Sequence, residues 1–414
     1  MSDSPDTSAR ALLRQRDYMR FWLARWTGGM GGMIQSVTLG WQVYEVARLS
    51  RSVAEASLML GMVGLVSFLP VLGLALPAGE SADRHDRRRV LLLCLAGEVV
   101  TVGVLCGLAL TDAATVPLLL GMAALFGCAR AFFAPANTAM GPMLVPRELL
   151  PRAIAWNSLA WQSAAIVGPA LGGVLVAISP ALGYGVALAL YATAGLCVWT
   201  IRANTQPQVQ PGSRWSLMKE GLRYVWTNKI VFGAISLDLA AVLLAGATAM
   251  LPVFARDILR VGPEGFGMLR AAPATGATVV AIHLAANPIR GRAGQVMFAG
   301  VAVFAAATIG FGWSRLLWAS VGLLALLGGA DMLSVYVRQT LVQLVTPDPM
   351  RGRVAAVSTL FIGASNELGE FRAGVAARLL GPVVAVVAGG FGALAVTAAW
   401  IRMFPALWRA DRLE

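Results

Sequence analysis

The sequence predicts an all-α polytopic membrane protein with twelve transmembrane helices in two pseudo-symmetric bundles of six. Three observations support this fold class. Only 13% of the 414 residues are charged, about half the share expected in a soluble protein, and the mean hydropathy is +0.70. Apolar runs of about 20 residues, enough to cross a bilayer as a helix, recur along the whole chain. Basic residues concentrate in alternate connecting segments, the pattern that orients membrane proteins.

The stretch PAGESADRHDRRR, residues 77–89, sets the topology because it separates two of these apolar runs. Its clustered charges cannot enter hydrocarbon, which predicts a tight turn at one membrane face. Four arginines in so short a loop place that face in the cytoplasm. Counting outward from this turn gives the spans 21–46, 54–78, 90–110, 116–143, 153–178, 182–201, 230–255, 264–287, 295–313, 315–345, 354–380 and 382–404.

Polar segments complete the predicted organisation. Residues 1–20 lack the charged, apolar and small-residue order of a signal peptide, so we expect a cytoplasmic N-terminus, and an even number of spans places the basic tail on the same side. Residues 202–216 are polar with two prolines and predict a linker. Leu217 to Lys229 predicts a short amphipathic helix on the cytoplasmic surface. The expected parts are a bundle at 1–201, a linker region at 202–229, and a second bundle with its tail at 230–414.

The net charge of +12 does not indicate nucleic-acid binding. When basic residues at the span ends are counted with the adjoining segments, 22 of the 33 lysines and arginines fall in cytoplasmic segments and 6 in outer segments. That distribution follows the positive-inside rule rather than forming a groove for phosphates. The charge therefore orients the chain in a membrane, and no nucleic-acid partner is expected.

An internal repeat relates the two predicted bundles. Shifting the chain by 201 residues sets VPRELLPRAIAWN against TPDPMRGRVAAVS, and it sets Arg130 on Asp331. A shared offset at proline, arginine and glycine positions indicates two copies of one helical unit, a feature typical of transporters. The matching positions are Pro146 with Pro347, Arg152 with Arg353, Gly168 with Gly369, and Gly173 with Gly374.

The spans, the linker, the repeat and the charged turn together resemble the major facilitator superfamily over essentially the whole chain. GESADRHDRRR is similar to the signature turn of that family, except that Asp86 stands where the general pattern prefers glycine. The resemblance implies that this turn latches the two halves on the cytoplasmic side in only one of two states. The matching positions are Gly79, Asp83, Arg84, Arg87 and Arg88.

Two further motifs carry the resemblance. Arg130 in LFGCARAFFAP matches the fourth-helix arginine of the family, although the glycine that follows in the motif is Ala134 here. VGPALGGVL resembles the antiporter signature of the drug-efflux branches, which favours export; its small residues allow close helix packing and its proline a bend. The local sequence is most similar to the enterobactin-exporter-like branch of siderophore and drug efflux proteins. The antiporter-like positions are Gly168, Pro169, Gly172 and Gly173.

Ten charged residues lie well inside the predicted spans, five of each sign, and Glu45 lies near an outer end. A charge in mid-span is costly unless it is paired or wetted, so each is a functional candidate. The equal numbers of acidic and basic residues also suggest that these charges neutralise one another. For each of these residues, a structural ion pair between helices is therefore the alternative to a functional role. Arg270 and Arg372 complete the basic set. The candidates for proton coupling or for lining a substrate cavity are Arg25, Glu98, Arg130, Asp238, Asp331, Arg338, Glu367 and Glu370.

Two groups of these candidates carry specific hypotheses. Arg130 and Asp331 are pseudo-equivalent, so we expect them either to line a central cavity and gate or bind, or to lock the halves as an ion pair. Arg338 lies two helical turns from Asp331 and shares its face. Glu367 and Glu370 share a helix face, and one of two nearby carboxylates can carry a proton. The alternative for this pair is a helix-end network that contacts the signature turn.

The expected function is secondary active export of a small amphipathic molecule (a siderophore, metabolite or drug) against inward protons by a monomer that alternates access. A lysophospholipid or lipid flippase of the same fold, an uptake symporter and a non-transporting receptor are the alternatives. Enzyme activity is not expected because the GxxxxGK[ST], HExxH and GxSxG motifs are absent. No cofactor or metal is expected, since the four cysteines fall in predicted spans without CxxC pairing.

Overall fold

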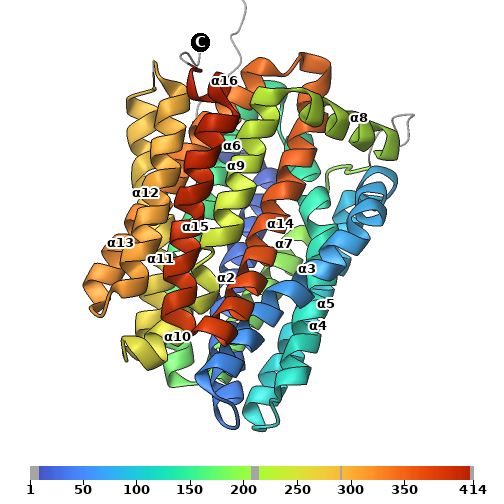
Figure 1. Ribbon diagram of the computed structural model, residues 1–414. Helices are drawn as coiled ribbons and strands as arrows, with labels where there is room; N and C mark the ends of the chain where they lie inside the picture. Colours follow the sequence, from blue (N-terminus) through green and yellow to red (C-terminus); the bar gives the residue numbers. More distant parts are fainter. Residues whose placement is uncertain (1–8, 207–213, 290, 411–414) are drawn as a thin grey trace, which may run out of the picture. The chain divides into compact units, whose positions relative to one another are not determined.

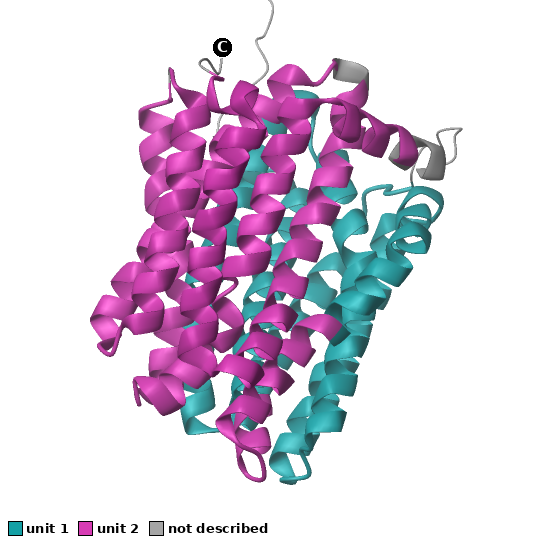
Figure 2. Ribbon diagram, in the orientation of Figure 1, with its two compact units in different colours: residues 1–42, 66–211 teal, residues 43–65, 212–414 magenta. Residues whose placement is uncertain are grey.

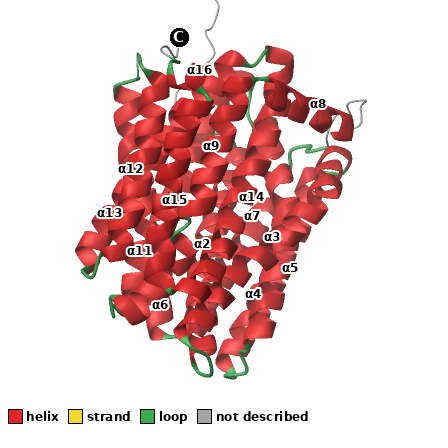
Figure 3. Cartoon of the chain, viewed as in Figure 1, coloured by secondary structure: helices red, strands yellow, loops and turns green. Residues whose placement is uncertain are grey.

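The computed structural model describes residues 9–206, 214–289 and 291–410. Within these ranges the chain is helical, and short loops and turns connect the helices (Figure 3). The chain divides into two compact units (Figure 2). The first unit holds residues 1–42 and 66–211, and the second holds residues 43–65 and 212–414.

The first half of the chain folds into six long helices preceded by the short α1 (Ala9–Leu13) (Figure 1). Each long helix coincides with one predicted span. The adjoining tips of the first two, residues 43–65, belong to the second unit. The six are α2 (Arg16–Arg48), α3 (Val53–Arg84), α4 (Arg87–Leu110), α5 (Val116–Met140), α6 (Leu150–Ile178) and α7 (Pro180–Trp199).

The second unit contains the other six predicted spans, preceded by α8 (Arg214–Thr227), where the sequence predicts an amphipathic helix. Val225 of α8 is buried in an apolar cluster with residues of α9 and α14, whereas Trp226 is exposed. The remaining helices are α9 (Lys229–Ala245), α10 (Leu251–Val253), α11 (Gly262–Ala286), α12 (Ala293–Trp313), α13 (Leu317–Val345), α14 (Asp348–Leu380), α15 (Pro382–Met403) and α16 (Pro405–Trp408).

Among the described residues, ten helices are long and apolar enough to cross a membrane. The two other long helices that match predicted spans, α2 and α14, have 33 residues each and are therefore long enough. Both sequences are interrupted by glycine and by charged or amide side chains, which lower the hydropathy of every stretch of crossing length. Helices of this kind need a polar interior or neighbouring helices to cover their polar faces.

The helices of the first unit alternate in direction, and contacts at one face show it. The Tyr18 hydroxyl near the start of α2 donates to the Ala153 carbonyl at the start of α6, at 2.8 Å. Arg87 at the start of α4 donates to the Ala139 carbonyl at the end of α5, at 3.0 Å. Burial raises the pKa of Tyr18 to about 12, although the charge of Arg25 opposes this shift, so the hydroxyl stays protonated and remains a donor.

The predicted repeat is visible in the backbone. Pro146 and Pro347 both precede a helical segment with φ of −57°, and their ψ values are 152° and 144°. A Cβ built on Gly168 of α6 would lie 2.5 Å from the Cβ of Met33 in α2. A Cβ built on Gly369 of α14 would lie 3.1 Å from a carbonyl oxygen of α9. Equivalent helices therefore pack at a glycine in each half, α6 against α2 in the first and α14 against α9 in the second.

The predicted span at 230–255 lies within the candidate span Lys229–Ile258, but the helix is interrupted inside it, because α9 ends at Ala245. Gly246 leaves the helix with φ −60° and ψ 87°. The chain continues through a 3₁₀ turn, η3 (Thr248–Met250), then α10, and then a π-helical turn, η4 (Phe254–Ile258). Arg270 of α11 donates to the Thr248 carbonyl at 3.4 Å. The Leu251 backbone N–H donates to the same carbonyl, so the partly buried guanidinium of Arg270 adds a second donor next to the break.

Gly328 and Gly322, both in α13, offer a matched test of helix packing. A Cβ on Gly328 would overlap the Pro273 carbonyl of α11, whereas a Cβ on Gly322 meets nothing within 4 Å. We predict that Gly328→Ala lowers the free energy of unfolding by about 1–3 kcal/mol, because the helices must move apart. Gly322→Ala should change it by less than about 1 kcal/mol. Thermal unfolding of the purified protein in detergent measures both, and equal midpoints would contradict this packing.

Candidate functional site

The charged turn predicted from the sequence spans the end of α3 and the start of α4, and only His85 and Asp86 lie between the two helices. Asp86 caps α4, since its carboxylate accepts from the Arg88 backbone N–H at 3.0 Å. The Thr205 hydroxyl donates to the same carboxylate oxygen. An aspartate at this position supplies an N-cap, which glycine provides only weakly. The departure from the family pattern therefore has a structural role that the sequence did not indicate.

The arginines of the turn differ in their environments. Arg87 and Arg88 are fixed by carbonyls of the first unit, those of Ala139 and Trp199 respectively. Arg84 is exposed and pairs with Glu80 at 2.9 Å on its own helix. Of the other residues that match the family's signature turn, Gly79 is buried in α3 and Asp83 is partly buried. The turn is thus anchored through Arg87 and Arg88 rather than through Arg84.

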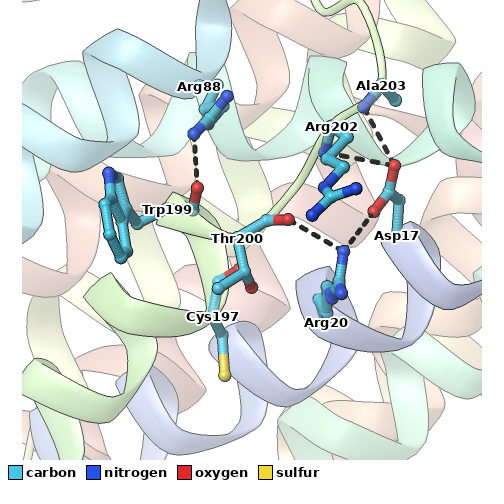
Figure 4. A network of polar contacts seen from close by, with 8 residues as sticks. All are labelled: Asp17, Arg20, Arg88, Cys197, Trp199, Thr200, Arg202 and Ala203. Carbon is cyan, nitrogen blue, oxygen red and sulfur yellow. Dashed lines mark hydrogen bonds and ion pairs between the residues drawn. The ribbon is translucent and has the colours of Figure 1, made fainter.

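The end of α7 is the anchor point (Figure 4). The last carbonyls of a helix have no partner within the helix and carry partial negative charge. Arg88 donates to the Trp199 carbonyl, and Arg20 donates to the Thr200 carbonyl at 2.8 Å. Asp17 accepts from Arg20 at 2.9 Å and from the Ala203 backbone N–H at 2.9 Å. Two guanidinium groups therefore join the starts of α2 and α4 to the end of α7.

A polar group lies in the interior of the first unit. Glu98 of α4 is only 4% exposed, and its Oε2 atom accepts no hydrogen bond from the described residues. The charges of Glu98 and of Arg130 in α5 both act on the hydroxyl of Tyr191 in α7. That hydroxyl donates to Gln35 Oε1 of α2 at 3.0 Å. Gln35 Nε2 is buried without a hydrogen-bond partner in the described part of the chain. Residues of four helices thus form a polar group that includes a carboxyl group with spare bonding capacity.

Arg25 of α2 lies beside an aromatic ring. Its guanidinium is 5.8 Å from the centroid of the Phe21 ring, within range of a cation–π contact. The two side chains help line a cavity of about 10 Å³, together with Phe133 and Asn137 of α5. A cavity of this size holds at most about one water molecule. Arg25 is therefore partly buried beside an aromatic ring rather than exposed to a large cavity.

The antiporter-like motif forms the contact between α6 and α2. A Cβ on Gly172 would lie 3.1 Å from Val37 Cβ and 3.2 Å from Ile34 Cα, and Gly168 meets Met33 one turn earlier. Pro169 and Gly173 are buried in the same stretch. The close helix approach expected from these small residues is present in the structure.

In the second unit, Asp238 of α9 and Arg338 of α13 form a buried ion pair. Their exposed fractions are 7% and 3%. The partner of Arg338 is therefore on another helix, although Asp331 shares its face of α13. Asp331 is partly buried and forms no ion pair with any residue in the described ranges. A pair so deeply buried is costly to break, since either charge alone would remain in a low dielectric.

Glu367 and Glu370 lie in the interior of α14, and both make polar contacts. Glu370 packs against the tip of α3, because a Cβ on Gly64 would lie 3.0 Å from Glu370 Oε2. One turn away, a Cβ on Gly61 would lie 2.9 Å from the Gly374 Cα. Two glycines thus let α3 and α14 approach closely, with Glu370 beside them.

A second polar group that the sequence did not indicate lies at the tips of α2 and η4. The Tyr44 hydroxyl donates to Asp257 at 2.5 Å, and Arg48 lies 3.6 Å from the same carboxylate. Arg256 lies 5.9 Å from the centroid of the Tyr44 ring. These residues stand near the ends of predicted spans and more than 200 positions apart, so no motif joins them. The π-helical turn brings Arg256 and Asp257 to the tip of α2.

Comparison with known proteins defines the class. The family model described as transmembrane secretion effector matches residues 7–412, so the chain belongs to this family of the major facilitator superfamily. Its relatives and structural neighbours are transporters rather than enzymes. The protein is therefore a major facilitator transporter.

Particular relatives refine this class. The enterobactin exporter EntS of Escherichia coli O1:K1 / APEC is 27% identical over 359 residues, which cover 85% of this chain and 84% of the relative. The crystal structure of a bacterial homologue of the human lysosomal transporter Spinster, inward-facing and unoccupied, has a TM-score of 0.70 at 16% identity and covers 95% of this chain and 96% of its own. That of a D-xylose–proton symporter has a TM-score of 0.68 at 13% identity, with 96% and 98% covered. Both structures share the fold.

The buried ion pair gives a prediction for stability. Asp238→Asn leaves the Arg338 charge without its partner and should lower the free energy of unfolding by about 3–5 kcal/mol. Removing both charges together, in Asp238→Asn with Arg338→Met, should recover most of that loss. Thermal unfolding in detergent measures the double-mutant cycle. Arg84→Gln, which breaks an exposed pair, is the control and should cost about 1 kcal/mol or less. Additive effects of the two single substitutions would show that the pair is not coupled.

Proposed function

We propose that the protein exports a small amphipathic molecule across the inner membrane of a bacterium and couples this export to inward proton movement by alternating access. Twelve helices cross the membrane in this proposal, with both termini in the cytoplasm. The halves 1–201 and 230–414 form the two bundles, joined by the linker region 202–229, and the working unit is a monomer. The positive-inside distribution of arginine and lysine supports this orientation.

The observation that carries the coupling is the environment of Glu98. A carboxylate buried away from water is strongly disfavoured unless a proton or a cation neutralises it. Glu98 has both options, because the positive charge of Arg130 in α5 acts on its carboxylate and its Oε2 accepts no hydrogen bond from the described residues. A group that exchanges one neutralising partner for the other is suited to couple proton binding to a second event. We therefore assign the proton to Glu98.

The direction of transport rests on three supports. The family is described as a secretion effector, the relative EntS is described as an enterobactin exporter, and the α6 motif resembles the antiporter signature. A siderophore is accordingly the first substrate to test, with other metabolites and drugs after it. Arg130 in the first unit and Asp331 in the second are the charged side chains that we propose contact the substrate.

The other charged candidates receive narrower roles. Asp238 and Arg338 are a structural pair in this proposal, because each neutralises the other at a buried position. Glu370 is a second proton candidate, since it lies against the tip of α3 where a change in packing would alter its surroundings. In this proposal the contacts of Tyr44 and Arg48 with Asp257 act as a latch at the outer side. Their release would accompany opening.

Coupled transport can be measured in sealed liposomes that contain a pH-sensitive dye. We predict that enterobactin or another transported compound drives a proton flux in the wild-type protein. Glu98→Gln should abolish this flux, because the amide cannot bind the proton, and Asp331→Asn should abolish transport with normal expression. Glu148→Gln, at an exposed carboxylate between α5 and α6 and outside the charged turn, is the matched control and should retain the flux.

Two outcomes would contradict the proposal. A normal substrate-driven flux in Glu98→Gln would remove Glu98 from coupling and leave Glu370→Gln as the next variant. No flux with any soluble compound, together with movement of a labelled lysophospholipid between leaflets, would identify a lipid flippase instead.

A further inference from the structure

A groove on the first unit has no role in the function proposed above. Its volume is about 620 Å³, and it lies between α4 and α5 and reaches Ser81 near the end of α3. Leu93, Val100, Leu125 and Phe132 are among its lining residues. The groove is separate from the polar group at Glu98, which is not one of the residues that line it.

The hollow arises from small side chains where the two helices meet. Gly97 of α4 and Ala129 of α5 lie at the contact, and a Cβ built on Gly97 would stand 3.9 Å from that of Ala129. Larger side chains rise on both sides, with Leu93 75%, Val100 65% and Leu125 52% exposed. On a transmembrane helix, exposed apolar side chains of this kind face lipid. The groove is therefore open to the hydrocarbon of the bilayer.

The length of the groove matches one leaflet. Its lining along α4 runs from Val90 to Thr101, which corresponds to about 17 Å at the helical rise of 1.5 Å per residue. Half of a hydrocarbon core of about 30 Å is about 15 Å. One end therefore lies at the charged turn and the other near the middle of the membrane. This is the depth range of a single acyl chain.

A basic side chain stands at the head of the groove. Arg89 precedes Leu93 by four residues and Ala96 by seven, so it lies on the same face of α4. Its side chain is 84% exposed, and its ion pair with Asp86 is long, at 3.9 Å, and therefore weak. Such an arginine can bind a phosphate at the membrane surface.

We propose that the groove binds one anionic phospholipid, with an acyl chain between α4 and α5 and its phosphate on Arg89. The lipid comes from the cytoplasmic leaflet, an assignment that rests on the orientation in the proposed function. The site itself does not depend on the transported substrate. It is formed by apolar walls of one-leaflet length and a cation at the surface end.

Native mass spectrometry of the full-length protein tests the site with dioleoylphosphatidylglycerol and dioleoylphosphatidylcholine as probes. The wild-type protein should retain phosphatidylglycerol in preference to phosphatidylcholine. Arg89→Gln should weaken phosphatidylglycerol retention about fivefold, the effect expected for one basic side chain near an anionic surface. Arg152→Gln, which removes an exposed arginine elsewhere in the first unit, is the matched control and should have no such effect.

Filling the groove provides the second arm. Gly97→Leu should reduce retention of both lipids, and Leu125→Trp should do the same without altering the contact between Gly97 and Ala129. Gly107→Leu, at an open position on the same helix, is the control for added volume. Equal retention of the two lipids by the wild-type protein, or unchanged retention in both Arg89→Gln and Leu125→Trp, would overturn the proposal. Because the readout is bound lipid, failure of the transport experiment leaves this test intact.

Discussion

The interior of each unit depends on one constraint, which is that a charge in a low-dielectric environment must be paired, protonated or wetted. The second unit meets it with the ion pair between Asp238 and Arg338. Their opposite charges neutralise each other, and each residue is less than a tenth exposed. The first unit meets it differently, because Glu98 retains a buried oxygen without a hydrogen-bond partner in the described residues. The two solutions suit different tasks: a closed pair stabilises packing, and an open carboxyl group can exchange a proton.

Small residues and helix breaks decide where these polar groups can form. Gly168 and Gly172 bring α6 against α2, and Gly61 with Gly374 brings the tip of α3 against α14. The halves differ where α9 breaks at Gly246, since α2 continues without interruption. That break leads into the π-helical turn that presents Asp257 to Tyr44. The repeat therefore supplies a common packing scheme, and local irregularity adds a contact that only the second half can make.

Hydropathy and charge clusters predicted the helices and the turn between α3 and α4 well, because burial in lipid imposes a long-range pattern on the sequence. Glycine spacing also predicted the close contact at Gly168. The pairing of Asp238 with Arg338 could not be predicted, since it depends on the rotation of two helices that are 100 positions apart. The capping role of Asp86 and the break at Gly246 depend on local backbone geometry that an apolar run does not reveal. The groove beside Gly97 forms because small side chains leave space between α4 and α5. Small residues of this kind follow no periodic pattern that the sequence would reveal.

The central claim is that Glu98 carries the coupled proton. Infrared difference spectroscopy of the reconstituted protein tests it directly, because a protonated carboxyl group absorbs separately from a carboxylate. The account predicts a protonated-carboxyl band in the wild-type protein that decreases as the pH is raised and that is absent from Glu98→Gln. The same band should remain in Glu148→Gln. A titrating band that persists in Glu98→Gln, or its absence from the wild-type protein, would contradict the account.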